Sequence, residues 1–166
     1  MTGVQTCALP ISHRYAEGRP FILGGVKIDS PFGMLAHSDG DVLTHAIIDA
    51  LFGAAGLPDI GQQFPDSDER YKGISSMELL KTAVETVRQA GFRAVYIDST
   101  VIAQEPKLSK HVEEIKKSIA ENTGLKPRQI NVKATTEERM GFTGALEGIS
   151  AHAVCLLEEL SRSSSV

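Results

Sequence analysis

The chain has 166 residues, enough for one domain with a hydrophobic core and too few for two domains of ordinary size. Hydrophobic residues make up 42% and charged residues 23%, which is ordinary for a soluble globular protein. The net charge of −4 argues against nucleic-acid binding through a broad basic surface. No apolar run approaches the roughly 18 residues of a membrane span, so we expect no membrane association.

The two ends of the chain differ from its centre. Residues 1–12 lack the basic start of a secretion signal, and we expect them to be a foreign or aberrant segment ahead of a single domain at 13–160. Residues 161–166 form a polar tail. Cys7 and Cys155 lie far apart without CxxC spacing, so we expect free thiols in a reducing compartment. The absence of a transit-like extension favours a bacterial cytoplasm over a plastid, which stays open.

The first elements in chain order are short. Residues 13–20 are rich in turn-forming residues, and residues 21–28 predict two short strands joined in a hairpin at Gly24-Gly25. Residues 30–33 indicate another turn. From Val42 onward the apolar residues recur at helical spacing, so Asp39 or Asp41 is the expected N-cap of a helix.

The second half alternates helices and strands. Ser75 and Glu78 have capping-box spacing before a helix that ends at Gly91, and a further helix begins near Leu108 and ends at Gly124. Strands are expected at residues 92–102, 130–136 and 149–157, with a helix as the lesser choice for the last. This order predicts an α/β fold, a sandwich of helices packed on one face of a mixed sheet.

A cluster of polar residues stands at the start of the first long helix. His37 and His45 enclose two aspartates within nine residues. A helix N-terminus favours anionic ligands, and imidazoles are common metal ligands. The simpler explanation is that these residues cap the helix and lie in solvent. Downstream, residues 59–68 form a loop with three aspartates, which suits cations or sugar hydroxyls but is also typical of a plain turn.

Several further motifs follow in a fixed order. They are His37-Ser-Asp-Gly-Asp-Val-x-x-His45, Asp59-Ile-Gly61, Phe64-Pro-Asp-Ser-Asp68, Ile102-Ala-Gln-x-Pro-Lys107, Val132-Lys-Ala-Thr-Thr136 and Gly141-Phe-Thr-Gly144. Together they resemble the 2-C-methyl-D-erythritol 2,4-cyclodiphosphate synthase family of the non-mevalonate isoprenoid pathway, from about His13 to Leu157. That resemblance implies a lyase that converts 4-diphosphocytidyl-2-C-methyl-D-erythritol 2-phosphate into the cyclic diphosphate and releases CMP.

The resemblance also implies roles for individual residues. His13 and His45 would ligate Zn²⁺, and Glu138 would help to hold a second divalent ion, Mg²⁺ or Mn²⁺. His37 and Thr136 would stabilise charge on the reacting phosphates. The substrate would be bound by His13, Ser38, Asp59, Gly61, Phe64, Pro65, Asp66, Ser67, Asp68, Ala103, Gln104, Pro106, Lys107, Leu108, Ser109, Thr135, Glu138 and Phe142. Of these, Asp59 and Gly61 would receive the ribose, residues 64–68 the methylerythritol end, and residues 103–109 the cytosine. The likeness further implies a homotrimer with sheets facing its centre and active sites shared between subunits.

One position departs from the family pattern. The family's opening strand ends in an Asp-x-His pair that supplies two zinc ligands, and the matching segment here is Ile11-Ser-His13. An alkyl side chain cannot coordinate zinc, so we expect weak zinc binding and slow turnover. Two alternatives remain, a catalytically silent trimer that binds cytidine nucleotides and a metal-dependent phosphohydrolase with a linear product.

Overall fold

The computed structural model describes residues 4–161, and for residues 4–9 it describes the backbone alone. A five-stranded sheet has the order β4-β1-β7-β5-β6. Its strands are β1 (Val4–Glu17), β4 (Phe32–Met34), β5 (Phe92–Ile102), β6 (Ile130–Thr135) and β7 (Gly148–Glu159). Only β5 and β6 run parallel, and the other neighbours are antiparallel. The predicted mixed sheet is confirmed.

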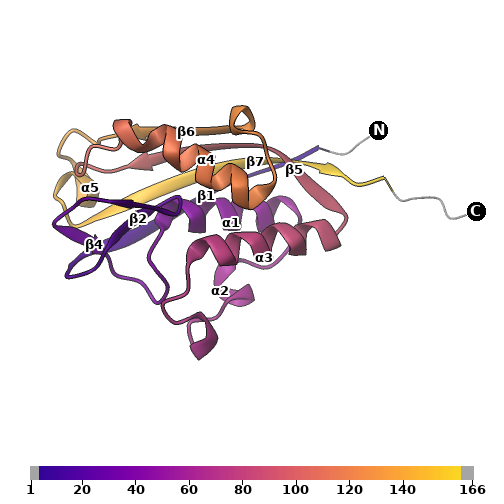
Figure 1. Cartoon of the computed structure of the whole chain (residues 1–166), viewed down its shortest axis with the longest axis horizontal. Helices are drawn as coiled ribbons and strands as arrows, with labels where there is room; N and C mark the ends of the chain where they lie inside the picture. The colour runs from indigo at the N-terminus through magenta and orange to yellow at the C-terminus, as the bar shows by residue number, and fades with distance from the viewer. Residues whose placement is uncertain (1–3, 162–166) are drawn as a thin grey trace, which may run out of the picture.

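The helices lie on one face of this sheet (Figure 1). They are α1 (Val42–Ala54), α3 (Ser76–Gln89) and α4 (Val112–Thr123). The burial of alternate residues in β5 and β7 shows why the helices lie on one face. Ile97, Val101 and Ala151 are fully buried on the helix side, whereas Tyr96 and Val154 on the other parity are 37% and 39% exposed. Successive side chains of a strand point to opposite faces, so one face carries the core and the other is left uncovered within this chain.

Helix α1 is the centre of the core. All of its residues except Gly53 are buried, because it contacts β1 and β7 on one side and α3 on another. Apolar residues surround the helix rather than forming a stripe, as expected of a helix enclosed by its neighbours. Burial of the start of α1 also brings polar residues, including His45, into the protein interior.

A single carboxylate fixes where α1 begins. Asp41 is fully buried, and its side chain accepts hydrogen bonds from Thr44 N at 3.0 Å and Thr44 Oγ1 at 2.8 Å. The same carboxylate accepts from the amides of Gly24 and Gly25 at 2.9 and 2.7 Å, in the turn between β2 (Phe21–Leu23) and β3 (Val26–Ile28). Both glycines have positive φ, which admits this tight approach at little cost. Asp41 therefore joins the hairpin to the helix.

Helices α3 and α4 begin and end close to the positions that their sequences indicate. Ser75 caps α3 by accepting from Met77 N, and Gly124 ends α4 in the left-handed conformation. The helix α3 presents Leu79, Leu80 and Ala83 to the core. In α4, Ile115 and Ile119 are fully buried.

Four sequence expectations for local structure were wrong. Residues 13–17 belong to β1 rather than to a turn, because eleven residues from Val4 to Arg14 pair with β7 and the strand continues to Glu17. Residues 32–34 form β4, and the segments expected as loops contain the short helices α2 (Ile60–Gln63) and α5 (Gly141–Gly144). The predicted hairpin at Gly24-Gly25 and the final strand are confirmed.

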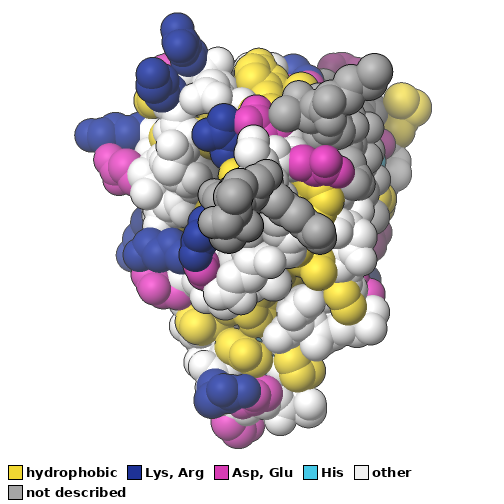
Figure 2. Space-filling model, turned by 90° about the vertical axis from the view of Figure 1, so that its right-hand side faces the viewer, with side chains coloured by type: hydrophobic (Ala, Val, Ile, Leu, Met, Phe, Trp, Pro, Cys, Tyr) yellow, Lys and Arg dark blue, Asp and Glu magenta, His cyan; other side chains and the backbone are white. Residues whose placement is uncertain are grey.

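Some expectations fall on parts that the structure does not describe. The tail beyond Ser161 lies outside the described residues, as does the side chain of Cys7. Whether residues 1–12 are foreign to the domain remains a prediction. In the described part of the chain, none of the helices combines the length and the apolar character that crossing a membrane requires. On the face in Figure 2, Asp and Glu side chains lie among the Lys and Arg side chains, so this face is not uniformly basic.

Candidate functional site

A cavity of about 360 Å³ lies beside the end of β1 and the first turn of α1. It brings together residues from five segments: β1, the loop that leads into α1, α1 itself, residues 60–71, and α3. Its lining residues are Ile11, His13, Leu35, Ala36, His37, Ser38, His45, Ile60, Gly61, Phe64, Asp66, Tyr71 and Leu79. Seven predicted site residues therefore meet in one place: His13, His37, Ser38, His45, Gly61, Phe64 and Asp66.

His13 and His45 are in direct contact in this cavity. The Nε2 atom of His13 lies 2.9 Å from Nδ1 of His45, and the two rings meet edge to face. Burial, with a smaller contribution from the charge of His13, lowers the pKa of His45 to about 3. Burial also lowers the pKa of His13, although Asp39 and Asp66 partly oppose this. Both imidazoles are therefore neutral near pH 7, which is the form that binds metal ions and donates or accepts single hydrogen bonds.

The other ring nitrogen of His45 contacts two hydroxyls. Nε2 lies 2.8 Å from Ser76 Oγ and 3.1 Å from Ser38 Oγ. Ser76 is fully buried at the start of α3, and its hydroxyl donates to Asp39 Oδ1 at 2.5 Å. Ser38 was among the predicted site residues, whereas Asp39 was predicted only as a possible N-cap, a position that Asp41 takes, and Ser76 had no predicted role. Asp39 and Ser76 are 37 positions apart in the sequence, and no periodic signal links residues at that separation.

His37 lines the cavity with one nitrogen unsatisfied. Its Nε2 atom is buried and has no hydrogen-bond partner within the described part of the chain. Leaving a buried polar atom unpaired costs about 1–3 kcal/mol, so such an atom in a cavity is a candidate contact for a ligand. This observation agrees with the phosphate-binding role that sequence analysis gave to His37.

The acidic segment at 59–68 is only partly directed into the cavity. Asp59 caps α2 by accepting from Gln62 N at 2.9 Å, and that interaction together with the Gln62 side chain lowers its pKa. Asp68 is bound by the side chain of Arg70, which lowers its pKa. Asp66 lines the cavity, whereas Pro65 is half-buried and Ser67 is exposed. Two of the three aspartates therefore have local structural partners.

The remaining predicted residues form a second cluster, where the parallel strands β5 and β6 end. Ala103 N donates to Thr135 O at 3.1 Å, and Arg139 N donates to Gln104 Oε1 at 3.2 Å. Thr136 Oγ1 donates to Glu138 Oε1 at 2.9 Å, and Glu138 itself has a φ of 52°. A non-glycine residue in this conformation is uncommon and is often found at functional sites. Lys107 and Ser109 are exposed, and Pro106 is half-buried.

This second cluster does not line the histidine cavity. None of the cavity's lining residues comes from 103–109 or 135–138. His13 and Ile102 flank β7 at Ile149 and Ser150, so the two clusters lie at the same end of the sheet with one strand between them. Ala103 and Leu108 are buried at 6% and 5% exposure, so their side chains pack in the core. Phe142 lies near His13, since both line a smaller cavity with Ser12 and Arg14.

Tyr15 links the two clusters, and sequence analysis did not find it. Its hydroxyl donates to the carbonyl of Glu105 at 2.7 Å, which ties β1 to the loop at 103–109. Burial raises the pKa of this phenol. The alternation that could have placed Tyr15 on a strand is obscured by the turn-forming residues Gly18 and Pro20 that follow it.

A zinc site with three protein ligands does not fit these residues. Tetrahedral ligands at Zn–N distances of about 2.0–2.1 Å would lie roughly 3.3 Å apart, so His13 Nε2 and His45 Nδ1 are close to a suitable spacing. The position beside them carries the alkyl side chain of Ile11, which also lines the cavity. Among the described side chains, no group of three or more His, Cys, Asp and Glu residues is placed to hold a metal ion.

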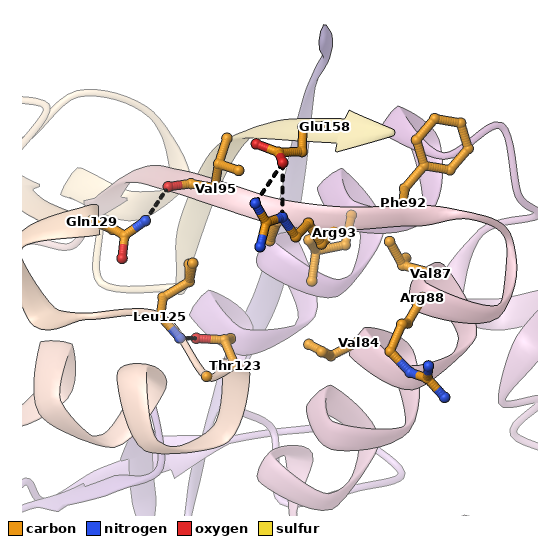
Figure 3. A pocket seen from close by; sticks show the side chains of 13 residues that line it. Val84, Val87, Arg88, Phe92, Arg93, Val95, Thr123, Leu125, Gln129 and Glu158 are labelled. Carbon is orange, nitrogen blue, oxygen red and sulfur yellow. Dashed lines mark hydrogen bonds and ion pairs between the residues drawn. The ribbon is translucent and has the colours of Figure 1, made fainter. Parts of the chain in front are cut away.

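A larger cavity, of about 490 Å³, lies elsewhere, among the last turns of α3 and α4 and the start of β5. Figure 3 shows that Arg93 is paired there with Glu158, and that Gln129 donates to the carbonyl of Val95. Arg88 points away to Glu85, at 2.7 Å. The charged side chains of this cavity are already paired with one another or with neighbours, and no predicted site residue lines it. The histidine cavity is therefore the candidate functional site.

Comparison with known proteins identifies the family of this chain. Residues 11–158 match the YgbB family. A 2-C-methyl-D-erythritol 2,4-cyclodiphosphate synthase of Azotobacter vinelandii is 55% identical over 145 residues, which cover 87% of this chain and 92% of that protein. The solved structure of the bifunctional IspDF from Campylobacter jejuni aligns with a TM-score of 0.93 at 43% identity, over 97% of this chain but 44% of that one. IspF of Plasmodium falciparum in complex with CDP aligns with a TM-score of 0.83 at 32% identity, over 96% and 98%. The chain belongs to the YgbB family, among relatives named 2-C-methyl-D-erythritol 2,4-cyclodiphosphate synthase.

Proposed function

We propose that this protein is a lyase that converts 4-diphosphocytidyl-2-C-methyl-D-erythritol 2-phosphate into 2-C-methyl-D-erythritol 2,4-cyclodiphosphate and CMP. The observation that carries this proposal is the convergence of His13, His37 and His45 with Gly61, Phe64 and Asp66 in one cavity. The family resemblance implies that these residues surround the metal ion and the reacting phosphates, the ribose and the methylerythritol end. The names of the relatives point to the same reaction.

The reaction needs positioned groups rather than a side-chain nucleophile. The 2-phosphate of the substrate attacks its own β-phosphate, the new P–O bond forms, and the bond to CMP breaks. Two anions must approach each other, so donors fixed near the phosphates lower the barrier by cancelling developing charge. His37, whose Nε2 atom has no partner within the described residues, is suited to contact a phosphate oxygen. Thr136 is proposed to do the same from the second cluster.

We propose that the two ends of the substrate are held by different loops. Asp59 and Gly61 would receive the ribose, and residues 64–68 the methylerythritol end. Residues 103–109, with Lys107, would receive the cytosine. Support for a cytidine site comes from two structural neighbours that were solved with CDP bound. Rigid contacts at both ends hold the two phosphates in the geometry of attack. The entropic cost of bringing the reacting groups together is then met by binding the substrate.

We also propose a homotrimer in which each active site is completed by a neighbouring subunit. The absence of residues 103–109 from the lining of the histidine cavity supports a site that is completed by a second subunit. The outer face of the sheet exposes Tyr96, His152 and Val154, which none of the helices within residues 4–161 covers. Packing these faces together around an axis would bury them and bring a second cluster to each cavity.

The proposed metal ions follow from the same residues. Zinc would have His13 and His45 as its only imidazole ligands, and Glu138 would contribute to a site for Mg²⁺ or Mn²⁺. Because Ile11 occupies the position of a third zinc ligand, we propose weak zinc binding and slow turnover. A cytoplasmic location is proposed because the named relatives come from bacteria.

An assay of CMP release tests the proposed function. The purified chain is incubated with the cytidyl substrate and Mg²⁺, with and without added Zn²⁺, and the products are followed by phosphorus NMR. We expect CMP together with a cyclic diphosphate. A linear diphosphate would identify a phosphohydrolase instead. Binding of CDP without any turnover, even with excess Zn²⁺, would identify the silent binding protein.

A further inference from the structure

Three side chains from separate parts of the sequence form a continuous chain of hydrogen bonds to His45. Asp39 lies in the loop before α1, Ser76 is the first residue of α3, and His45 is in the first turns of α1. Ser76 Oγ lies 2.5 Å from Asp39 Oδ1 and 2.8 Å from His45 Nε2. Ser76 is fully buried and His45 is 8% exposed, so water has little access to the contact between them.

The chemistry of these groups decides which atoms carry the protons. An ionised carboxylate can only accept hydrogen bonds, so the single hydroxyl proton of Ser76 points to Asp39. Ser76 Oγ can then only accept from His45, which requires the proton of the imidazole to be on Nε2. Nδ1 of the neutral ring is left with its lone pair, and this is the atom that lies 2.9 Å from His13 Nε2.

Asp39 is itself held in place by backbone amides. Ser76 N donates to Asp39 Oδ2 at 2.9 Å, and Asp41 N donates to Oδ1 at 3.2 Å. The carboxylate lies at the N-terminus of α3, where unpaired N–H groups favour negative charge. The backbone of Asp39 is also fixed, because its amide donates to the carbonyl of Ile74 at 3.1 Å. The acceptor that orders the chain of hydrogen bonds is therefore rigidly held.

We propose that Asp39 and Ser76 are positioning residues, which hold the proton of His45 on Nε2 and keep the lone pair of Nδ1 directed at His13. Outer partners of this kind fix the tautomer and the orientation of a ligating imidazole. The inference rests on the proposed role of His45 at the reacting end of the site, but it concerns the metal-free protein. Ser38 Oγ, at 3.1 Å from the same Nε2, can also accept a hydrogen bond from a proton on that nitrogen.

The tautomer can be observed directly in the metal-free, full-length chain. Ring nitrogens of ¹⁵N-labelled protein are measured by long-range proton–nitrogen correlation NMR at pH 7.5, after treatment with a chelator. The five histidines are assigned with the help of a His45→Gln variant. We expect the nitrogen shifts of His45 to show protonated Nε2 and bare Nδ1. A proton on Nδ1 in the parent protein overturns the inference without the need of any variant.

Two variants and one matched control test the cause. In Asp39→Asn the amide can donate to Ser76 Oγ, which frees the hydroxyl proton for Nε2, and we expect the fraction of the Nδ1-protonated form to rise roughly fivefold, the factor for one ordinary hydrogen bond. Ser76→Ala should shift the ratio less, because Ser38 remains. Ser75→Ala removes the cap of α3 but does not touch His45, so its spectrum should match the parent.

The outcomes separate this inference from the proposed function. If Asp39→Asn and Ser76→Ala both keep the parent ratio of tautomers, as Ser75→Ala does, then Asp39 and Ser76 do not position His45. If a variant fails to fold, the spectrum of the parent protein still shows which ring nitrogen of His45 carries the proton. A parent chain that releases CMP with its His45 proton on Nδ1 would overturn the positioning role and leave the proposed reaction intact.

Discussion

Restoring a carboxylate at position 11 tests the account of the metal site most directly. Ile11 pairs with Ala151 across β1 and β7 and lines the cavity beside His13. Two residues apart on a strand, the side chains at positions 11 and 13 emerge on the same face. In Ile11→Asp the new carboxylate therefore faces the space next to His13 Nε2 and His45 Nδ1.

The expected gain in affinity follows from the energy of such sites. Structural zinc sites with four ligands contribute about 10–16 kcal/mol, or roughly 3 kcal/mol for each ligand. A third protein ligand should therefore lower the Kd for Zn²⁺ by about 100-fold. Without zinc the variant should be less stable by roughly 1 kcal/mol, because half-buried apolar surface at position 11 is lost. With zinc at 100 times its Kd, binding adds about 2.7 kcal/mol to the stability of the variant, which then exceeds that of the parent.

The measurement is a titration of the chelator-treated protein with Zn²⁺ against a competing indicator, together with thermal unfolding with and without zinc. Ile11→Asn is the control, because it has nearly the size of aspartate without its charge. A gain in affinity of less than about fivefold for Ile11→Asp over Ile11→Asn would contradict the assignment of position 11 as the missing ligand. Tight stoichiometric zinc binding by the parent chain would contradict it as well.

Three further predictions concern Asp41 and Lys107. Asp41→Ala should lower the free energy of unfolding by about 3 kcal/mol in a denaturant titration, because buried donors on Gly24, Gly25 and Thr44 lose their acceptor. The control Asp59→Ala, at the exposed cap of α2, should lower it by less than about 1 kcal/mol. Burial raises the pKa of Asp41 to about 6, so its contribution to stability is complete below the unfolded pKa near 3.8 and is lost as the pH rises through 6. The difference in unfolding free energy between the parent and Asp41→Asn should therefore change by about 3 kcal/mol between pH 4 and pH 7, and a constant difference would refute the raised pKa. Lys107→Ala should weaken CDP binding about tenfold by calorimetry, the factor for a hydrogen bond from a charged group, and Lys110→Ala should not; equal effects of the two would remove Lys107 from the nucleotide site.

Local sequence signals predicted the elements that depend on local physics. The strand at 92–102 and the capped start of α3 were located within a residue, because β-branched periodicity and a serine cap act over a few positions. The extent of β1 was not predicted, because residues 14–17 carry weak strand preference. Arg14 is held by pairing with β7, more than a hundred residues away in the sequence, and residues 15–17 are held by pairing with β4. Distant pairing of this kind leaves no periodic pattern in either segment.

In the candidate site, too, local patterns were predictable from the sequence and distant contacts were not. The spacing of the motifs singled out His37 and His45, the family resemblance added His13, and the fold brings all three into one cavity. It could not reveal that Ser76 and Asp39 stand behind His45, because that contact depends on how α3 packs against α1. It also could not show that Ala103 and Leu108 face the core, since their burial follows from the course of the loop after β5.

The carboxylate of Asp41 serves three backbone amides at once, those of Gly24, Gly25 and Thr44. Opening the hairpin turn alone would leave part of this carboxylate buried without its hydrogen-bond donors, so the hairpin turn and the first turn of α1 should open together. In native-state hydrogen exchange the three amides should therefore share one protection factor. The segment that carries His45 is thereby coupled to a hairpin that does not line the histidine cavity.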